Sequence, residues 1–188
     1  MSAAAGPGTY KSLHPLRFSS DALAAAHSHA SEGYPFEVVG ILAGSRAENE
    51  VSEVLRLVNE RLKPGGDRGV DGAAPAQAAG HREGVLEGPG NRYRVDPLLQ
   101  MRAEMAVEAR GLEVVGYYHS HPDHPARYSE YDREHAVPNM SYTIVSVVGG
   151  AVRDTLSWRL AEDRSTMHPE PVTVLPAPDG ALTQSRES

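Results

Sequence analysis

Residues 112–132 read LEVVGYYHSHPDHPARYSEYD, and this stretch decides the fold that we expect for the chain. Its first seven residues are mostly β-branched, aromatic or apolar, which predicts a buried strand running into His119. Side chains two apart on a strand face the same way, so His119 and His121 can converge on one point. Ser129, with Asp132 three residues later, is typical of a capped helix start. We therefore predict that this helix folds back and that Asp132 joins the two histidines as a third metal ligand.

Two histidines and one carboxylate form one of the ligand sets of catalytic zinc, which keeps a fourth position for water. Zinc lowers the pKa of bound water from about 15.7 toward about 7 and polarises a substrate carbonyl. A general base is still needed, and a carboxylate at the edge of the metal site is the usual group. Ser129 can also donate to a tetrahedral oxyanion through Oγ, provided that capping leaves the hydroxyl free. A metal-dependent hydrolase is therefore the leading hypothesis.

The His-x-His spacing by itself is weak support. With nine histidines in 188 residues, one such pair is close to what chance supplies. His27 and His29 repeat the spacing within a predicted helix, where residues two apart do not share a face, so we expect both on the surface. We also expect His124 and His135 on the surface, with a role beside the metal ligands as the less favoured alternative. The hypothesis depends on the conjunction of a strand end, a proline and a capped helix that bears the acid.

Composition bounds the remaining possibilities. The 188 residues, 40% hydrophobic and 23% charged, fit one soluble globular domain with its own core. A net charge of -7 argues against nonspecific nucleic-acid binding. The absence of cysteine excludes disulfides, thiolate metal sites and a cysteine nucleophile, and leaves the redox compartment undetermined. No apolar run approaches a membrane span and the N-terminus lacks a signal-peptide pattern, so we expect a cytoplasmic protein without a membrane partner. The oligomeric state stays open.

The order of the predicted elements indicates an α/β or α+β layer fold with a mixed sheet. Hydrophobic patterns and turn residues predict strands at 14–18, 38–44, 51–58, 92–95, 112–118, 142–148, 152–160 and 172–175. We expect two hairpins, 38–44 with 51–58 and 142–148 with 152–160, and an edge strand at 172–175. Three helices are predicted: one capped by Ser19 or Ser20 that runs to about residue 32, one capped by Asp96 that runs to about residue 110, and one capped by Ser129. In the second helix we expect a core stripe, with a Met-lined ligand box as the alternative; the stripe consists of Leu98, Met101, Met105 and Ala109.

A long segment of the chain does not suit regular structure. Residues 63–91 are rich in glycine and proline. We expect a disordered insertion there, with a substrate-contacting flap as the alternative. We also expect loose ends at residues 1–14 and 177–188.

His119-Ser120-His121-Pro122, followed after six residues by Ser129 and then by Asp132, resembles the signature of the JAMM/MPN+ zinc metalloproteases. Members of that family place a glutamate ahead of a Gly-x-Leu-x-Gly-like strand, and the segment EVVGILAG at 37–44 looks like it. The similarity covers roughly residues 15–162, which we take as the domain. The resemblance implies a JAB/MPN-like curved mixed sheet flanked by helices.

The resemblance also implies a role for each residue of the site. Glu37 corresponds to the general acid/base, a choice that the residues alone do not make among 25 acidic side chains. Ser129 corresponds to a hydrogen-bond donor on the oxyanion side. The implied zinc ligands are His119, His121 and Asp132.

Members of this family cut peptide or isopeptide bonds at the C-terminal glycine of ubiquitin-like modifiers. Compact prokaryotic members are similar to proteases of small sulfur-carrier or modifier proteins, so the resemblance implies a zinc metallopeptidase whose substrate partner is such a protein. Two other classes stay open. One is a catalytically silent MPN scaffold, and the other is a non-haem iron oxygenase that uses two histidines and a carboxylate. Metal analysis and oxygen uptake would separate the three.

Overall fold

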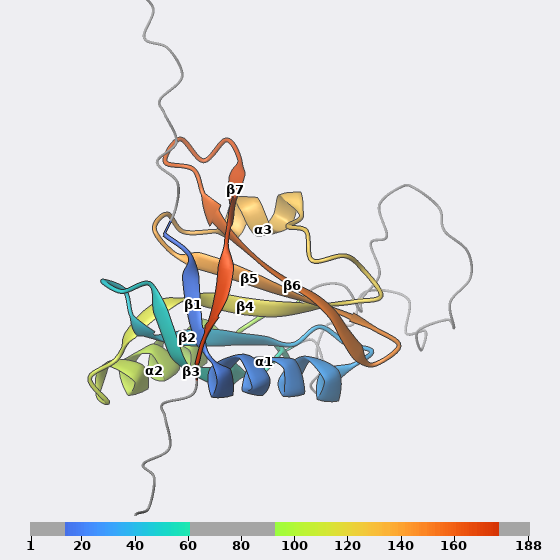
Figure 1. The fold of residues 1–188 in the computed structure, drawn as a ribbon, viewed down its shortest axis with the longest axis horizontal. Helices are drawn as coiled ribbons and strands as arrows, with labels where there is room; N and C mark the ends of the chain where they lie inside the picture. The colour runs from blue at the N-terminus through green and yellow to red at the C-terminus, as the bar shows by residue number, and fades with distance from the viewer. Residues whose placement is uncertain (1–13, 61–92, 177–188) are drawn as a thin grey trace, which may run out of the picture.

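The computed structural model describes residues 14–60 and 93–176, which form one curved mixed sheet with three helices (Figure 1). The strands, in chain order, are β1 (Leu16–Ser19), β2 (Val39–Ser45), β3 (Glu50–Leu57), β4 (Glu113–Pro122), β5 (Ser141–Val148), β6 (Ala151–Leu160), β7 (Met167–Glu170) and β8 (Val172–Leu175). The helices are α1 (Ser20–Gly33), α2 (Pro97–Glu108) and α3 (Glu130–His135). The predicted α+β class is confirmed.

The order of strands across the sheet is β7-β6-β5-β4-β2-β3-β1-β8. The two predicted hairpins, β2–β3 and β5–β6, are present as antiparallel pairs, and β8 is an edge strand as expected. Strand β4 lies near the centre, antiparallel to β2 and parallel to β5. The sequence did not predict β7. The central place of β4 matters because both histidines of the expected metal site lie on it.

The helices cover both faces of the sheet, since neighbouring residues on a strand point to opposite sides. On β2, Leu42 packs in a cluster with Ala22 and Ala26 of α1. Its neighbour Ile41 packs with Val107 of α2 on the other face. Figure 1 shows α3 beside the β5–β7 part of the sheet, away from α1 and α2.

All three helices begin at the residues that the sequence predicts. The Oγ of Ser19 accepts a hydrogen bond from the N–H of Ala22 at 3.1 Å. Asp96 accepts one from the N–H of Leu98 at 2.8 Å, with proline at the first helical position. Such caps satisfy backbone donors that the helix leaves unpaired.

The predicted core stripe of α2 is wrong. Leu98, Met101 and Met105 are 61%, 49% and 59% exposed, and Ala109, at the C-cap, is exposed too. The buried contact of the helix comes from Val107, with Ala103 packed beside it. The spacing identified an apolar stripe, but packing against the sheet selected a different one. The strand expected at 92–95 is also absent, because residues 93–95 have no regular structure and residue 92 lies outside the described residues.

The two histidines of α1 are not surface residues, contrary to expectation. His27 Nε2 lies 2.8 Å from Thr155 Oγ1 on β6, and His29 Nδ1 lies 2.8 Å from the Tyr118 hydroxyl on β4. Both side chains are partly buried against the sheet. Each histidine therefore links α1 to a different strand through a polar contact. His135, in contrast, is exposed as predicted.

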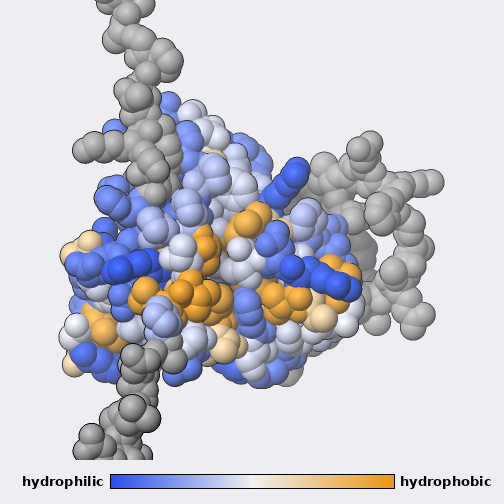
Figure 2. Space-filling view, viewed as in Figure 1, coloured by the Kyte–Doolittle hydropathy of each residue, from blue (hydrophilic) through white to orange (hydrophobic). Residues whose placement is uncertain are grey.

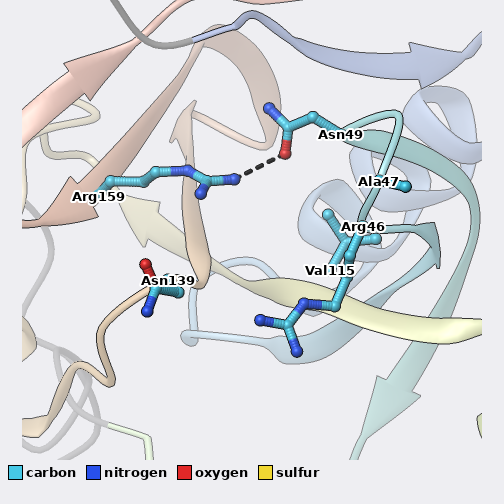
Figure 3. Close-up of a pocket in the computed structure, with 6 residues that line it drawn as sticks. All are labelled: Arg46, Ala47, Asn49, Val115, Asn139 and Arg159. Atoms are coloured by element: carbon cyan, nitrogen blue, oxygen red, sulfur yellow. Dashed lines mark hydrogen bonds between the residues drawn. The ribbon is translucent and has the colours of Figure 1, made fainter. Parts of the chain in front are cut away.

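A buried polar network links strands β6 and β7 to the turn between β2 and β3. The Glu170 carboxylate on β7 accepts hydrogen bonds from Asn49 at 3.0 Å, Ser157 at 2.8 Å and Arg159 at 2.6 Å. Arg159 also donates to Asn49 at 2.7 Å (Figure 3). Next to this network lies a cavity of about 400 Å³, lined by Arg46, Ala47, Asn49, Val115, Asn139 and Arg159. The cavity contains none of the residues predicted for the metal site.

Figure 2 shows apolar residues gathered across the middle of the face seen in Figure 1, with hydrophilic surface around them. In the part of the chain that the structure describes, no helix is both long and apolar enough to cross a membrane. The expected insertion at 63–91 and the loose end at 177–188 lie outside the described residues, as do residues 1–13. Strands β7 and β8 continue the sheet beyond residue 162, and the predicted domain of 15–162 stays a prediction.

Candidate metal centre

The predicted ligands come together at the end of β4. One ligand atom from each of His119, His121 and Asp132 lies within 4.8 Å of the other two. The Nε2 atoms of the two histidines are 3.0 Å apart, and His119 Nε2 is 3.5 Å from Asp132 Oδ1. Strand alternation brings the two rings to one side of the sheet, and the helix α3 delivers the carboxylate, as the spacing predicts.

Both histidines are held in the neutral state that a metal ligand needs. Burial lowers the pKa of His119 to about 4, although the charge of Asp132 opposes the shift. Burial also lowers the pKa of His121. His121 Nδ1 lies 2.9 Å from the carbonyl oxygen of Pro125, which accepts a hydrogen bond from the Nδ1–H tautomer. That tautomer leaves the Nε2 lone pair directed at His119, where a shared cation would lie.

Asp132 is positioned by the cap of its own helix. One oxygen, Oδ2, accepts hydrogen bonds from the Ser129 N–H and the Ser129 hydroxyl, both at 2.7 Å. The other oxygen, Oδ1, faces His119. Burial alone would raise the pKa of Asp132, but the neighbouring His119 and the hydrogen bonds from Ser129 lower it overall. The side chain is therefore a buried carboxylate with one oxygen held by the cap and one directed at the histidines.

The structure places Ser129 at the site with its hydroxyl already in use. Its Oγ accepts from the N–H of Asp132 at 3.2 Å while donating its single hydrogen to Asp132 Oδ2. This reciprocal arrangement is a capping box. The oxyanion role expected for Ser129 stays a prediction, and in this arrangement the hydroxyl serves the carboxylate of Asp132.

Glu37 lies beside the histidine strand because of the pairing between β2 and β4. Val39 pairs with His119, and Val38 exchanges two hydrogen bonds of 3.0 Å with Ser120. Glu37 immediately precedes Val38, and Asn59 donates to the Glu37 carbonyl oxygen at 3.0 Å. Glu37 is only 5% exposed. The expected base is therefore a buried residue just ahead of the strand that pairs with the histidine strand, and its role stays a prediction.

The three side chains suit a zinc ion. Two nitrogens that each lie about 2.0–2.1 Å from one tetrahedral zinc are about 3.3 Å apart. The two histidine Nε2 atoms are 3.0 Å apart, and the distance from His119 Nε2 to Asp132 Oδ1 is 3.5 Å. Two neutral imidazoles and one carboxylate supply one net negative charge, which a dication compensates in a buried setting. The nitrogen and oxygen donor set also agrees with a protein that has no cysteine.

Two residues near this centre escaped the sequence analysis. Tyr93 lies with its ring centroid 5.2 Å from that of His119, at a tilt of 41°. Asn59 is buried and donates to the carbonyl oxygen of Glu37 at 3.0 Å, while its own side-chain oxygen accepts from the N–H of Arg94 at 3.1 Å. Neither residue belongs to a motif with a fixed spacing, so no sequence signal could have identified them.

The chain belongs to the prokaryotic homologs of the JAB domain, since the model of that family matches residues 19–161. The family predicted from the histidine motif and the segment around Glu37 is thereby confirmed.

Among characterised proteins, the chain is similar to the desampylase of Haloferax volcanii, with 32% identity over 139 residues that cover 71% of this chain and 82% of the relative. It is also similar to a probable TtuB-protein conjugate cleaving protease of Thermus thermophilus, with 30% identity over 143 residues that cover 76% and 77% of the two chains.

Two solved structures have the same fold. A protein from Salinibacter ruber superposes with a TM-score of 0.57 at 31% identity, covering 89% of this chain and 95% of the other. A protein from Desulfitobacterium hafniense superposes with a TM-score of 0.62 at 22% identity, covering 87% and 94%.

Proposed function

We propose that this protein is a zinc-dependent isopeptidase that releases a ubiquitin-like or sulfur-carrier protein from its conjugates by cutting the bond after the modifier's C-terminal glycine. The observation that carries the proposal is the convergence of His119, His121 and Asp132 on one point. The buried Glu37 lies just ahead of β2, the strand that pairs with the histidine strand. The names of the two relatives, a desampylase and a conjugate cleaving protease, support the same reaction and the same class of substrate.

In the proposed reaction, His119, His121 and Asp132 hold zinc, and a bound zinc ion supplies an activated water and polarises the scissile carbonyl. The Glu37 carboxylate accepts a proton from the attacking water and gives it to the leaving amine as the carbon–nitrogen bond breaks. Burial of Glu37 excludes bulk water, which would compete for that proton. The side-chain amide of Asn59 donates a hydrogen bond to the carbonyl oxygen of Glu37. This bond holds the Glu37 backbone in place and so limits where the Glu37 carboxylate can lie.

Glu37→Gln tests the base directly. The ligand set survives in this variant while proton transfer is lost, so we expect unchanged zinc content and a fall in kcat of at least about 10²-fold. The substrate is a ubiquitin-like protein extended beyond its Gly-Gly end, with products read by mass. Glu48→Gln, at an exposed acid paired with Arg17, is the matched control and should cleave normally. Retained cleavage by Glu37→Gln would reject the assignment of Glu37.

Metal analysis separates this proposal from the other two classes. His119→Ala should lose zinc and activity together. A purified wild-type protein that binds no zinc and cleaves no conjugate would favour a scaffold, and iron with oxygen uptake would favour an oxygenase. The cytoplasmic location and the absence of nucleic-acid and membrane partners stay predictions.

A further inference from the structure

Tyr93 is placed at the metal centre by a hydrogen-bonded link that starts from the base. Asn59 follows β3 and binds the carbonyl oxygen of Glu37 with its amide nitrogen and the N–H of Arg94 with its amide oxygen. The N–H of Glu60 donates to the carbonyl oxygen of Arg94 at 2.7 Å. Residue 93 is therefore fixed against the start of β2 although it belongs to no helix or strand.

The ring of Tyr93 packs against a metal ligand, and its hydroxyl lies within the field of both site carboxylates. The ring centroids of Tyr93 and His119 are 5.2 Å apart. Burial raises the pKa of the Tyr93 phenol, and the negative charges of Asp132 and Glu37 raise it further. A phenol keeps its proton in the neutral range, so Tyr93 offers a hydrogen-bond donor beside a proposed metal ligand.

The donor is available for substrate. Among the residues that the structure describes, the Tyr93 hydroxyl makes no hydrogen bond, whereas the hydroxyl of Ser129 gives its only hydrogen to Asp132. A tetrahedral intermediate of amide hydrolysis carries a negative oxygen, and donors already aimed at that oxygen stabilise it. A protonated phenol is well suited to this task, because it donates without carrying a charge that would need compensation when buried.

We propose that Tyr93 is a further catalytic residue, whose hydroxyl donates a hydrogen bond to the scissile carbonyl oxygen as it becomes tetrahedral. The phenol keeps its proton throughout, so the proton balance stays with the attacking water, Glu37 and the leaving amine. This inference rests on the proposed isopeptidase function and adds a donor from the segment between β3 and α2.

Tyr93→Phe tests the proposal, because it keeps the ring against His119 and removes only the hydroxyl. We expect kcat for the extended ubiquitin-like substrate to fall about 10²-fold, the scale seen for loss of one oxyanion donor, with KM and zinc content unchanged. Tyr117→Phe is the matched control. Its hydroxyl donates to Glu104 on α2 at 2.8 Å, so this variant loses a phenol hydrogen bond away from the centre and should keep its kcat.

A binding measurement gives a readout that does not depend on turnover. A phosphinic peptide built on the modifier's C-terminal sequence carries a tetrahedral, anionic group in place of the scissile amide. By calorimetry, zinc-loaded Tyr93→Phe should bind it about 10- to 100-fold more weakly than wild type, on the same scale as the loss of kcat. The cleaved modifier ending in Gly-Gly should bind both proteins equally.

The outcomes separate the two proposals. If wild type cleaves the substrate and Tyr93→Phe has the same kcat and the same affinity for the phosphinic peptide, the role of Tyr93 is overturned while the isopeptidase function stands. Loss of zinc or of folding stability in Tyr93→Phe would instead assign the residue to support of His119. A wild-type protein that takes up zinc but cleaves no extended modifier overturns both.

Discussion

Replacement of Ser129 by alanine tests how the cap serves the metal centre. The variant loses the hydrogen bond from Oγ to Asp132 Oδ2 at 2.7 Å and the one from the Asp132 N–H to Oγ at 3.2 Å. It keeps the bond from the Ser129 N–H to Oδ2 at 2.7 Å. Loss of an N-cap side chain costs about 0.5–2 kcal/mol, and a hydrogen bond to a charged group contributes about 1.5–3 kcal/mol. Because one hydroxyl makes both bonds, we expect the free energy of unfolding of the metal-free protein to fall by about 1–3 kcal/mol.

The same change should weaken metal binding more than it slows the reaction. Removal of a group that orients a metal ligand typically costs about 10- to 100-fold in metal affinity, so we expect that loss for zinc in Ser129→Ala. Competition with a chromophoric chelator measures it. With zinc at saturation, Asp132 still has its backbone donor, and kcat should stay close to that of wild type. Ser129→Thr keeps a hydroxyl at the same place and should restore the zinc affinity.

The result that would refute this reasoning is specific. If Ser129→Ala binds zinc as tightly as wild type but loses about 10²-fold in kcat at saturating zinc, the hydroxyl acts on the oxyanion instead of on Asp132. Ser129 would then donate to the oxyanion, as the family resemblance implies. Its hydrogen bond to Asp132 would have to break when substrate binds.

Two further predictions concern stability. Burial, with a smaller effect of Arg56, lowers the pKa of His29 to about 4 from 6.5, so the unfolded chain binds more protons between those values and the free energy of unfolding falls as the pH drops through that window. Urea titrations of the metal-free protein should show a shallower fall in His29→Gln, and an unchanged slope would contradict the prediction. An added Cβ at Gly116 would lie 1.9 Å from the backbone oxygen of Ser141, so Gly116→Ala must separate β4 from β5. We expect the thermal midpoint to fall, with about 1–3 kcal/mol or more of lost stability, and a midpoint equal to that of wild type would show that the strands shift freely.

The parts of the fold that the sequence predicted well depend on short-range geometry. A cap such as Ser19, Asp96 or Ser129 accepts a hydrogen bond from a backbone N–H two or three residues further along the chain. The residues that form the cap are therefore close together in the sequence and can be recognised there. The β2–β3 and β5–β6 hairpins likewise join strands that follow one another with few residues between them.

The misread face of α2 shows where such reasoning stops. Helical spacing finds apolar residues that share one side, and Leu98, Met101 and Met105 do share a side. The side that is buried is decided by how the whole helix sits on the sheet, and there the smaller Val107 and Ala103 make the contact. His29 was misassigned for the same reason, because its partner Tyr118 lies on a distant strand.

The sequence by itself determined the two histidines on one strand and the acid at a capped helix start, because strand alternation and the capping box are local consequences of the backbone. The tertiary structure decided what surrounds them. Glu37 lies just ahead of β2, which pairs with β4, and Tyr93 is next to Arg94, whose N–H donates to Asn59. These placements join segments far apart in the chain, and the contacts that fix them come from packing and strand pairing, which no local pattern encodes.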